Sequence, residues 1–138
     1  MSRFLLAALL MLVPAEVQAA TLTITVKNVD SRGGTLRVSL YDESTWSRSE
    51  DDPLASANEA AVSPETVITL TDIKPGVYGV KMFQDANNNG KFDQNLIGLP
   101  LEHYGFSRDA RPFLSEPSFD RASFGVHDGH NAITIHLQ

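Results

Sequence analysis

Strict alternation of apolar and polar residues in the first third of the sequence is the feature that most constrains the fold. In residues 21–29 and again in residues 35–42, three successive alternate positions are apolar and are separated by polar residues. The apolar positions are Leu22, Ile24, Val26, Leu36, Val38 and Leu40. A period of two with β-branched residues predicts half-buried strands. The turn residues 30–34 (DSRGG) lie between the two stretches, so we expect the strands to form a hairpin.

Further short strands are predicted along the chain. Residues 65–71 alternate in the same way, and residues 77–83 carry apolar side chains on both faces, which favours a central strand. Residues 118–126 and 132–137 predict a second hairpin, because the dipeptide Asp128-Gly129 between them is a strong turn signal. Short strands at close spacing, with scarcely any helical period, predict an all-β fold: an antiparallel β-sandwich of about seven strands.

One stretch, residues 43–63, has no clear period. It contains Trp46, the single tryptophan of the chain, and an alanine-rich run at residues 54–61. That run fits either a short helix across one end of the sandwich or a long loop.

The first nineteen residues have the organisation of a signal peptide. Arg3 lies near the amino terminus, residues 4–13 are ten apolar residues in a row, and Pro14 ends the run. Residues 17–19 (VQA) supply the small residues of a cleavage site, so we expect cleavage before Ala20. Residues 20–138 would then form a single β-sandwich domain. Ten apolar residues are too few to cross a bilayer as a helix, and no membrane insertion is expected after cleavage.

The net charge and the absence of cysteine indicate which kinds of partner and which cellular compartment to expect. The formal net charge is −6 and no cluster of basic residues is found, so nucleic acid, whose phosphates require Lys and Arg, is not an expected partner. The chain has no cysteine, and the expected domain is large enough to form a core without disulfides. We therefore expect a periplasmic or secreted protein.

A loop of carboxylate and amide side chains follows the predicted strand 77–83. Residues 85–93 read DANNNGKFD and fit the pattern D-x-N-x-N-G-x-x-D. The candidate metal ligands are the side chains of Asp85, Asn87, Asn89 and Asp93 and the carbonyl group of Lys91. Hard oxygen donors at positions 1, 3, 5, 7 and 9, with a glycine at position 6 for the sharp turn, are typical of calcium loops.

This loop is expected to bind calcium only weakly. Position 12 is Leu96, where an EF-hand has a bidentate Glu, so the pattern resembles strand-flanked calcium loops that end at position 9. Two carboxylates, Asp85 and Asp93, predict a dissociation constant of about 10⁻⁴ to 10⁻³ M. Glu102 is a candidate to complete the ligand shell. The same residue types also form metal-free turns, in which Asx side chains bond to their own backbone, and both interpretations stay open.

Motifs around and beyond this loop carry a resemblance to a known family. They are Pro75-Gly76-x-Tyr78, Asp85-x-Asn87-x-Asn89-Gly90-x-x-Asp93-x-Asn95, Gly98-x-Pro100-x-Glu102-x-Tyr104-Gly105-Phe106-Ser107 and Pro117-Ser118-Phe119-Asp120-x-Ala122. They resemble the exported bacterial family known as domain of unknown function 2141 (DUF2141). The resemblance implies a periplasmic or secreted β-sandwich and supplies no activity. The stretch from Leu70 to Tyr78 also resembles transthyretin-like and carboxypeptidase-regulatory sandwiches, which are mostly accessory modules.

The expected function is that of a non-catalytic module. In the leading hypothesis, a structural calcium loop positions residues 96–107 for contact with an unknown protein or glycan. The alternative is a metal-independent carbohydrate- or protein-binding module that uses Tyr104 and Phe106. A hydrolase would need Glu102 and His103 as acid and base, but neighbouring strand residues point to opposite faces. The sequence has neither a nucleophile elbow nor a zinc-protease motif, so we expect no enzyme.

Overall fold

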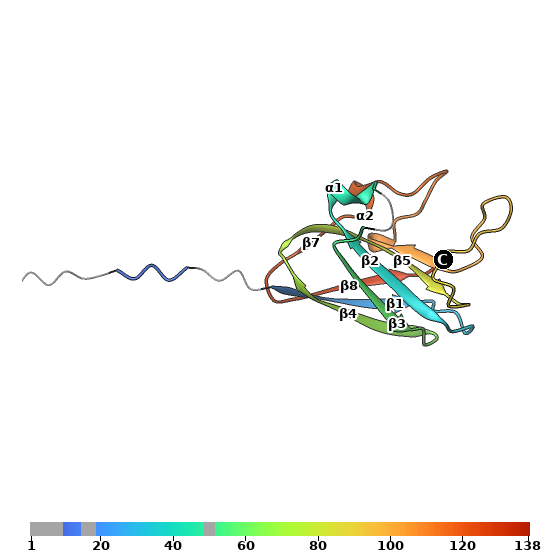
Figure 1. Ribbon diagram of the computed structural model, residues 1–138, viewed down its shortest axis with the longest axis horizontal. Helices are drawn as coiled ribbons and strands as arrows, with labels where there is room; N and C mark the ends of the chain where they lie inside the picture. Colours follow the sequence, from blue (N-terminus) through green and yellow to red (C-terminus); the bar gives the residue numbers. More distant parts are fainter. Residues whose placement is uncertain (1–9, 15–18, 49–51) are drawn as a thin grey trace, which may run out of the picture.

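The computed structural model describes residues 10–14, 19–48 and 52–138, which form two β-sheets (Figure 1). The first sheet has the strand order β4-β1-β8; in the second the order is β3-β2-β5-β6, and β7 pairs with the first residues of β5. The strands are β1 (Ala20–Lys27), β2 (Thr35–Tyr41), β3 (Ala55–Ala60), β4 (Glu65–Ile73), β5 (Gly76–Asp85), β6 (Tyr104–Phe106), β7 (Phe124–Val126) and β8 (His130–His136). The helical turns are α1 (Glu43–Trp46), the 3-10 helix η1 (Ser107–Asp109) and α2 (Phe119–Ala122). In the described ranges, no helix is both long and apolar enough to span a membrane.

One hydrophobic core lies between the two sheets. The alternating stretches place every second side chain in it, as their period predicts. Its strand residues include Leu22, Ile24, Val26, Leu36, Val38, Leu40, Ile68, Leu70, Val80, Met82 and Ile135. At Gly105 of β6, a Cβ atom would lie 2.7 Å from the Ile135 side chain, so glycine is what allows β6 to approach β8 this closely. The predicted all-β character is confirmed, and β5 is a central strand as expected.

The predicted hairpin of residues 21–42 is wrong. β1 pairs with β4 and, in parallel, with β8, whereas β2 pairs with β3 and β5 in the other sheet. An alternating pattern fixes which face of a strand is buried, but both strands bury their apolar face whether they lie in one sheet or in two. The parallel β1–β8 pair also means that the fold is not purely antiparallel.

The predicted C-terminal hairpin is wrong for the same reason. β7 pairs with β5 and β8 pairs with β1, so the two strands belong to different sheets. The Asp128-Gly129 dipeptide does form a turn, with Gly129 at φ 85°, and the Gly129 carbonyl accepts a hydrogen bond from Thr21 at 2.9 Å. The turn therefore leads the chain from one sheet to the other. The first part of the predicted strand 118–126 forms α2.

Residues 55–60 form the edge strand β3, in place of the helix or loop predicted for residues 54–61. β3 pairs with β2 along its whole length, and Ala55 and Ala57 are partly buried against the core while most of its other side chains are exposed. Alanine gives little periodic signal, so backbone pairing with β2 decides the structure here. With β3 included, the described part of the chain forms eight strands, where about seven were predicted.

Most of the predicted signal peptide, residues 1–9 and 15–18, lies outside the described residues, so the signal peptide stays a prediction. Ala20, where cleavage is expected, is the first residue of β1 and is fully buried.

A second, smaller cluster covers part of the outer face of the β3-β2-β5-β6 sheet. It consists of Tyr41, Trp46, Ala110 and Ala122, with Phe106 and Phe119 packed against them. The ammonium group of Lys81 lies 4.7 Å from the ring centre of Tyr41 and 4.6 Å from that of Trp46, and it pairs with Glu116 at 2.7 Å. These contacts hold α1 and the chain around Glu116 against the sheet.

Candidate functional site: the polar loop after strand β5

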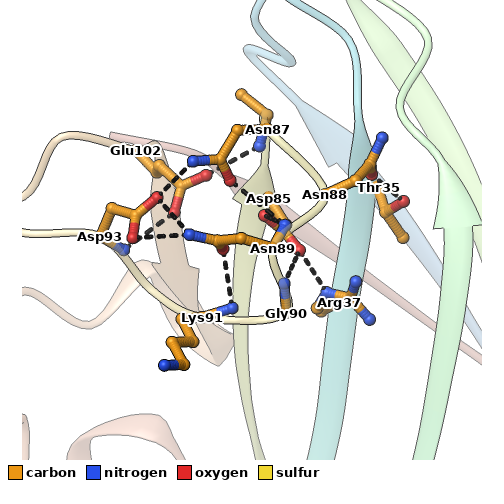
Figure 2. A network of polar contacts seen from close by, with 11 residues as sticks. Thr35, Arg37, Asp85, Asn87, Asn88, Asn89, Gly90, Lys91, Asp93 and Glu102 are labelled. Carbon is orange, nitrogen blue, oxygen red and sulfur yellow. Dashed lines mark hydrogen bonds and ion pairs between the residues drawn. The ribbon is translucent and has the colours of Figure 1, made fainter.

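The polar loop, residues 85–93, begins where β5 ends. Asp85 is the last residue of β5 and its side chain is fully buried. One carboxylate oxygen accepts hydrogen bonds from Arg37 Nε at 2.7 Å and from the Gly90 N–H at 2.8 Å, and the other accepts from the Asn89 N–H at 3.1 Å. Arg37 is on β2 and pairs with Phe83 of β5, so β2 brings the guanidinium group to the start of the loop (Figure 2).

The surroundings of Asp85 favour its charged form. Burial by itself raises the pKa of the carboxyl, but the hydrogen bonds from Arg37, Gly90 and Asn89, together with the Arg37 charge, outweigh burial. The pKa of Asp85 is consequently lowered from its ordinary value. The carboxylate already has a cationic partner and two backbone donors, which is the arrangement that a buried charge requires.

The other three side-chain ligands predicted for calcium come together at the far end of the loop. The amide nitrogen of Asn87 donates to Asp93 at 2.8 Å, and that of Asn89 donates to both Asp93 oxygens at 2.9 and 3.0 Å. The two amide oxygens accept from the backbone, from the Asn89 N–H at 3.3 Å and the Lys91 N–H at 2.9 Å. The loop is thus closed by its own amides, as in the metal-free interpretation.

Lys91 takes part differently from the prediction. It contributes its N–H to the network, and Figure 2 shows its side chain pointing away from the other labelled residues. Asn88, which the calcium pattern does not use, accepts a hydrogen bond from the Thr35 hydroxyl at 2.6 Å and so joins the loop to β2.

Glu102 holds the two ends of the polar loop together. Its side chain is buried, and its two oxygens accept the Ala86 N–H at 2.8 Å and the Asp93 N–H at 2.9 Å. The sequence suggested Glu102 as an additional metal ligand or, with His103, as part of a hydrolase site, and its part in closing the loop was not predicted. His103 engages other groups, with Nε2 3.4 Å from Asp30 and Nδ1 3.3 Å from the Asn28 carbonyl, so Glu102 and His103 have separate partners.

Gln84 is a buried polar residue whose role was not predicted from the sequence. Its amide donates to the carbonyls of Asp30 and Gly33 at 2.8 Å each and accepts the Asp30 N–H at 2.8 Å. These bonds fix the connection between β1 and β2 beside the polar loop. A signal was present, because Gln84 continues the inward-facing register of Val80 and Met82, where an apolar residue is expected.

The side-chain oxygens of the polar loop are of the kind that bind a hard cation, although they already accept hydrogen bonds within the protein. Carboxylate and amide oxygens are ligands that calcium accepts. Across the described ranges, no group of three or more His, Cys, Asp or Glu side chains is placed to hold a metal ion. A shallow depression of about 390 Å³ lies beside the loop, lined in part by Arg32, Asn87, Asp93 and Glu102.

The apolar loop, residues 94–101, follows directly and extends away from the sheets at the upper right of Figure 1. Its aliphatic side chains are exposed: Leu96 fully, Ile97 by 80%, and Leu99 and Leu101 by more than half. The Asn95 side chain accepts the N–H groups of Ile97 and Leu99 at 3.0 and 2.9 Å, and the Leu101 N–H donates to the Asp93 carbonyl at 2.9 Å. Hydrogen bonds therefore hold these apolar side chains in solvent.

Tyr104 and Phe106, the residues of the alternative binding surface, lie in a row of aromatic rings. Phe83, Phe92, Tyr104, Phe106 and Trp46 contact one another in that order, with ring centres 5.5 to 6.3 Å apart. Tyr104 and Phe106 are half-buried, and the ring pairs are steeply inclined. The polar loop contributes Phe92 to this row, so the row also fixes the loop on the sheet.

Comparison with known proteins gives a family and no activity. No curated protein and no solved structure matches the chain. The family model described as "Uncharacterized protein conserved in bacteria (DUF2141)" matches residues 24–134, about four-fifths of the chain. That range includes the polar loop, Glu102 and the apolar loop, together with all or part of every strand. The chain therefore belongs to the DUF2141 family.

Proposed function

We propose that the chain is an exported, non-catalytic β-sandwich module of the transthyretin- or immunoglobulin-like kind, and that its apolar loop contacts a component of the cell envelope. One observation carries the proposal: four aliphatic side chains are exposed on a loop that polar contacts hold at its base. Contiguous exposed apolar side chains on a soluble domain are typical of interaction sites. A loop that is already ordered loses little conformational entropy on binding.

The polar loop and Glu102 supply the rigid base of the apolar loop. Glu102 fixes the N–H of Asp93, and the Asp93 carbonyl accepts the N–H of Leu101 at the other end of the apolar loop. The isolated bridge between Gln94 and Pro100 closes the same base. All three carboxylates of the site are engaged in holding the loop: Asp85 by Arg37 and backbone N–H groups, Asp93 by the Asn87 and Asn89 side-chain amides, and Glu102 by backbone N–H groups.

An association experiment tests this function. The full chain is mixed with the envelope fraction of the bacterium that encodes it, and the bound protein is measured by sedimentation. We expect Leu96→Asp/Ile97→Asp to lose most of the binding while its melting temperature stays unchanged, because both side chains are exposed. Val62→Asp, at an exposed apolar residue between β3 and β4, is the matched control and should bind like the wild type. Equal binding by all three proteins would exclude the apolar loop as the contact site.

Calcium binding by the polar loop is a second proposal, supported by the convergence of the Asn87, Asn89 and Asp93 side chains. The Asn amide nitrogens that now face Asp93 would have to give way to oxygens, so three hydrogen bonds to Asp93 would be exchanged for ion contacts. That exchange is consistent with weak binding. The ion would reinforce the base of the apolar loop.

Thermal melting in calcium and in chelator tests the metal. If the dissociation constant is about 0.1 mM, calcium at about 1 mM stabilises the fold by roughly 1.4 kcal/mol, a rise in melting temperature of about 5 °C. Asp93→Asn should abolish the rise. An unchanged melting temperature in the wild type would reject the metal and leave the role of the apolar loop untouched.

The metal-independent use of Tyr104 and Phe106 remains as an alternative, favoured by the row of aromatic rings on the outer face of the sheet. Binding to a glycan array that Phe106→Ala removes, and that Leu96→Asp leaves intact, would support the aromatic surface over the apolar loop.

A further inference from the structure

We infer that β3 is the contact between two copies of this chain, which pair antiparallel through their β3 edges and so join their β3-β2-β5-β6 sheets into one. This contact is separate from the apolar loop of the proposed function. The apolar loop lies at the upper right of Figure 1, whereas β3 and β4 lie at the lower side of the molecule in that view.

The fold closes one side of the sandwich and leaves the other open. On the closed side, Gln138, which follows β8, exchanges two backbone hydrogen bonds with Tyr104 of β6, at 3.1 and 2.9 Å, and the Asp109 side chain accepts the His136 N–H at 2.8 Å. On the open side, β4 and β3 are the last strands of their sheets within the described ranges. An unpaired strand edge is a template for another strand, so proteins that stay monomeric protect it.

The edge of β4 is protected, whereas that of β3 is nearly unprotected. β4 carries the exposed charged residues Glu65 and Asp72, and its pairing with β1 shifts register near its end. β3 (ASANEA) contains neither proline nor lysine, keeps one register with β2 along its length, and carries a single charge, Glu59. The other side chains of β3 are small, so a second backbone can approach it closely.

The backbone groups of β3 that point away from β2 belong to Ser56, Asn58 and Ala60. Just beyond the strand, the Ala61 N–H donates to the Gly34 carbonyl at 2.9 Å. Alternate residues of a strand bond to opposite sides, so the other odd-numbered residues of β3 also bond to β2, and the even-numbered residues face outward. The three outward residues are exposed, and within the described part of the chain no strand pairs with this side of β3.

One antiparallel register between two copies uses all of these outward groups. With a twofold axis at Asn58, this residue lies opposite Asn58 of the second copy, and Ser56 lies opposite Ala60 of the second copy. Each such pair exchanges two backbone hydrogen bonds, so no outward N–H or C=O group is left over. The same register brings Leu54 across from Val62 of the second copy, and both are exposed in the single chain, by 51% and 59%. This match at both ends of the edge favours a second copy over an unrelated extended segment.

Charge and size determine the strength of the pair. In this register Glu59 lies opposite Ala57 of the second copy, so the two Glu59 residues are diagonal neighbours about 7 to 8 Å apart. Each copy also carries a net charge of −6, so the copies repel each other, and salt screens that repulsion. One added strand pair and its flanking apolar contacts fall short of the roughly 800 Å² that a standard interface buries on each partner. We therefore expect a reversible dimer that salt strengthens.

Sedimentation velocity over a wide range of protein concentrations tests the dimer, with the chain purified as the cell produces it. The dissociation constant should fall as salt is added, and fall in Glu59→Gln. Asn58→Pro removes an N–H that points away from β2, so the fold is kept while the two central hydrogen bonds of the dimer are lost. Its dissociation constant should rise by about tenfold or more. A wild type that is monomeric at every concentration, or a dimer unchanged in a folded Asn58→Pro, would overturn the inference.

Cysteine cross-linking tests the register. The chain has no cysteine, and opposite residues of a hydrogen-bonded antiparallel pair have Cα atoms about 5.5 Å apart, within reach of a disulfide. Under a mild oxidant, Asn58→Cys should form a covalent dimer by itself, whereas Ser56→Cys and Ala60→Cys should do so only when they are mixed. Leu114→Cys, at a residue that is 97% exposed and outside β3, is the control for random collision. If Asn58→Cys cross-links no faster than Leu114→Cys, the inference is wrong, whether or not Asn58→Pro folds.

The dimer and the proposed function can fail separately. Leu96→Asp/Ile97→Asp should dimerise like the wild type, because the apolar loop lies outside the contact, and a monomeric wild type would leave its binding to the envelope unaffected. Since Val62 lies at the dimer contact, the envelope experiment is carried out below the dissociation constant of the dimer. All variants are then monomers, and Val62→Asp remains a matched control.

Discussion

Replacing Glu102 by alanine should loosen the polar loop and lower the stability of the whole domain. The Glu102 carboxylate is 5% exposed and accepts two backbone N–H groups, from Ala86 at 2.8 Å and from Asp93 at 2.9 Å. A hydrogen bond to a charged group contributes about 1.5 to 3 kcal/mol. Water can reach the exposed side of the loop and replace part of this, so we expect a loss of about 2 to 4 kcal/mol rather than the full sum.

Thermal unfolding followed by circular dichroism measures the loss, which corresponds to a drop of roughly 8 to 16 °C for a domain of this size. In Glu102→Ala, hydrogen exchange at the Ala86 and Asp93 amides should become faster by a larger factor than exchange at the amides of the core strands. Glu65→Ala is the matched control, because Glu65 is half-exposed, lies 3.8 Å from Lys27, and should change stability by less than about 0.5 kcal/mol. If the two variants melt together, the carboxylate does not hold the loop.

Three further predictions follow from the same region and its neighbours. Gly34→Ala would place a Cβ atom 2.1 Å from the Asp85 carbonyl oxygen at φ 82°, so chemical denaturation should show a loss of roughly 3 to 5 kcal/mol. Because the pKa of Asp85 is lower in the folded than in the unfolded state, the ionised carboxylate stabilises the fold at a pH above its unfolded-state pKa, and this stabilisation is lost as the pH falls through its folded-state pKa. The melting temperatures of the wild type and of Asp85→Asn should therefore begin to converge below about pH 4. A constant difference between them down to about pH 2 would contradict the assignment. Gly79→Ala would bring a Cβ atom within 2.6 Å of the Trp46 ring, which should cost about 1 to 3 kcal/mol and change the fluorescence of this single tryptophan.

The sequence predicted which faces of the strands are buried better than it predicted how the strands pair. Alternation placed Leu22, Ile24 and Leu36 in the core correctly, because side-chain direction is a local property of an extended chain. Strand pairing is decided by contacts between distant residues, and β1 found its partners in β4 and β8 rather than in the next strand. Local turn signals therefore predicted two hairpins that do not form.

In the candidate site, too, local features could be predicted from the sequence, whereas contacts between distant residues could not. Asp85, Asn87, Asn89 and Asp93 lie in one loop that is closed by hydrogen bonds, and their predicted role as calcium ligands stays a prediction. The positions of Arg37 and Glu102 depend on strand register and on a chain segment that returns after the apolar loop, so residue spacing within the loop could not reveal them. Arg37 supplies the positive charge beside Asp85, and Glu102 accepts the backbone N–H groups at both ends of the loop.

The parallel pairing of β1 with β8 determines when the molecule can fold. β1 sits in the middle of its sheet, but one of its two neighbours, β8, comes about a hundred residues later in the chain. Until residues 130–136 are released, Ile24 and Val26 lack half of their surroundings and the row of backbone groups along β1 stays open. A chain that is still being synthesised thus keeps this sheet incomplete until β8 is available to pair with β1.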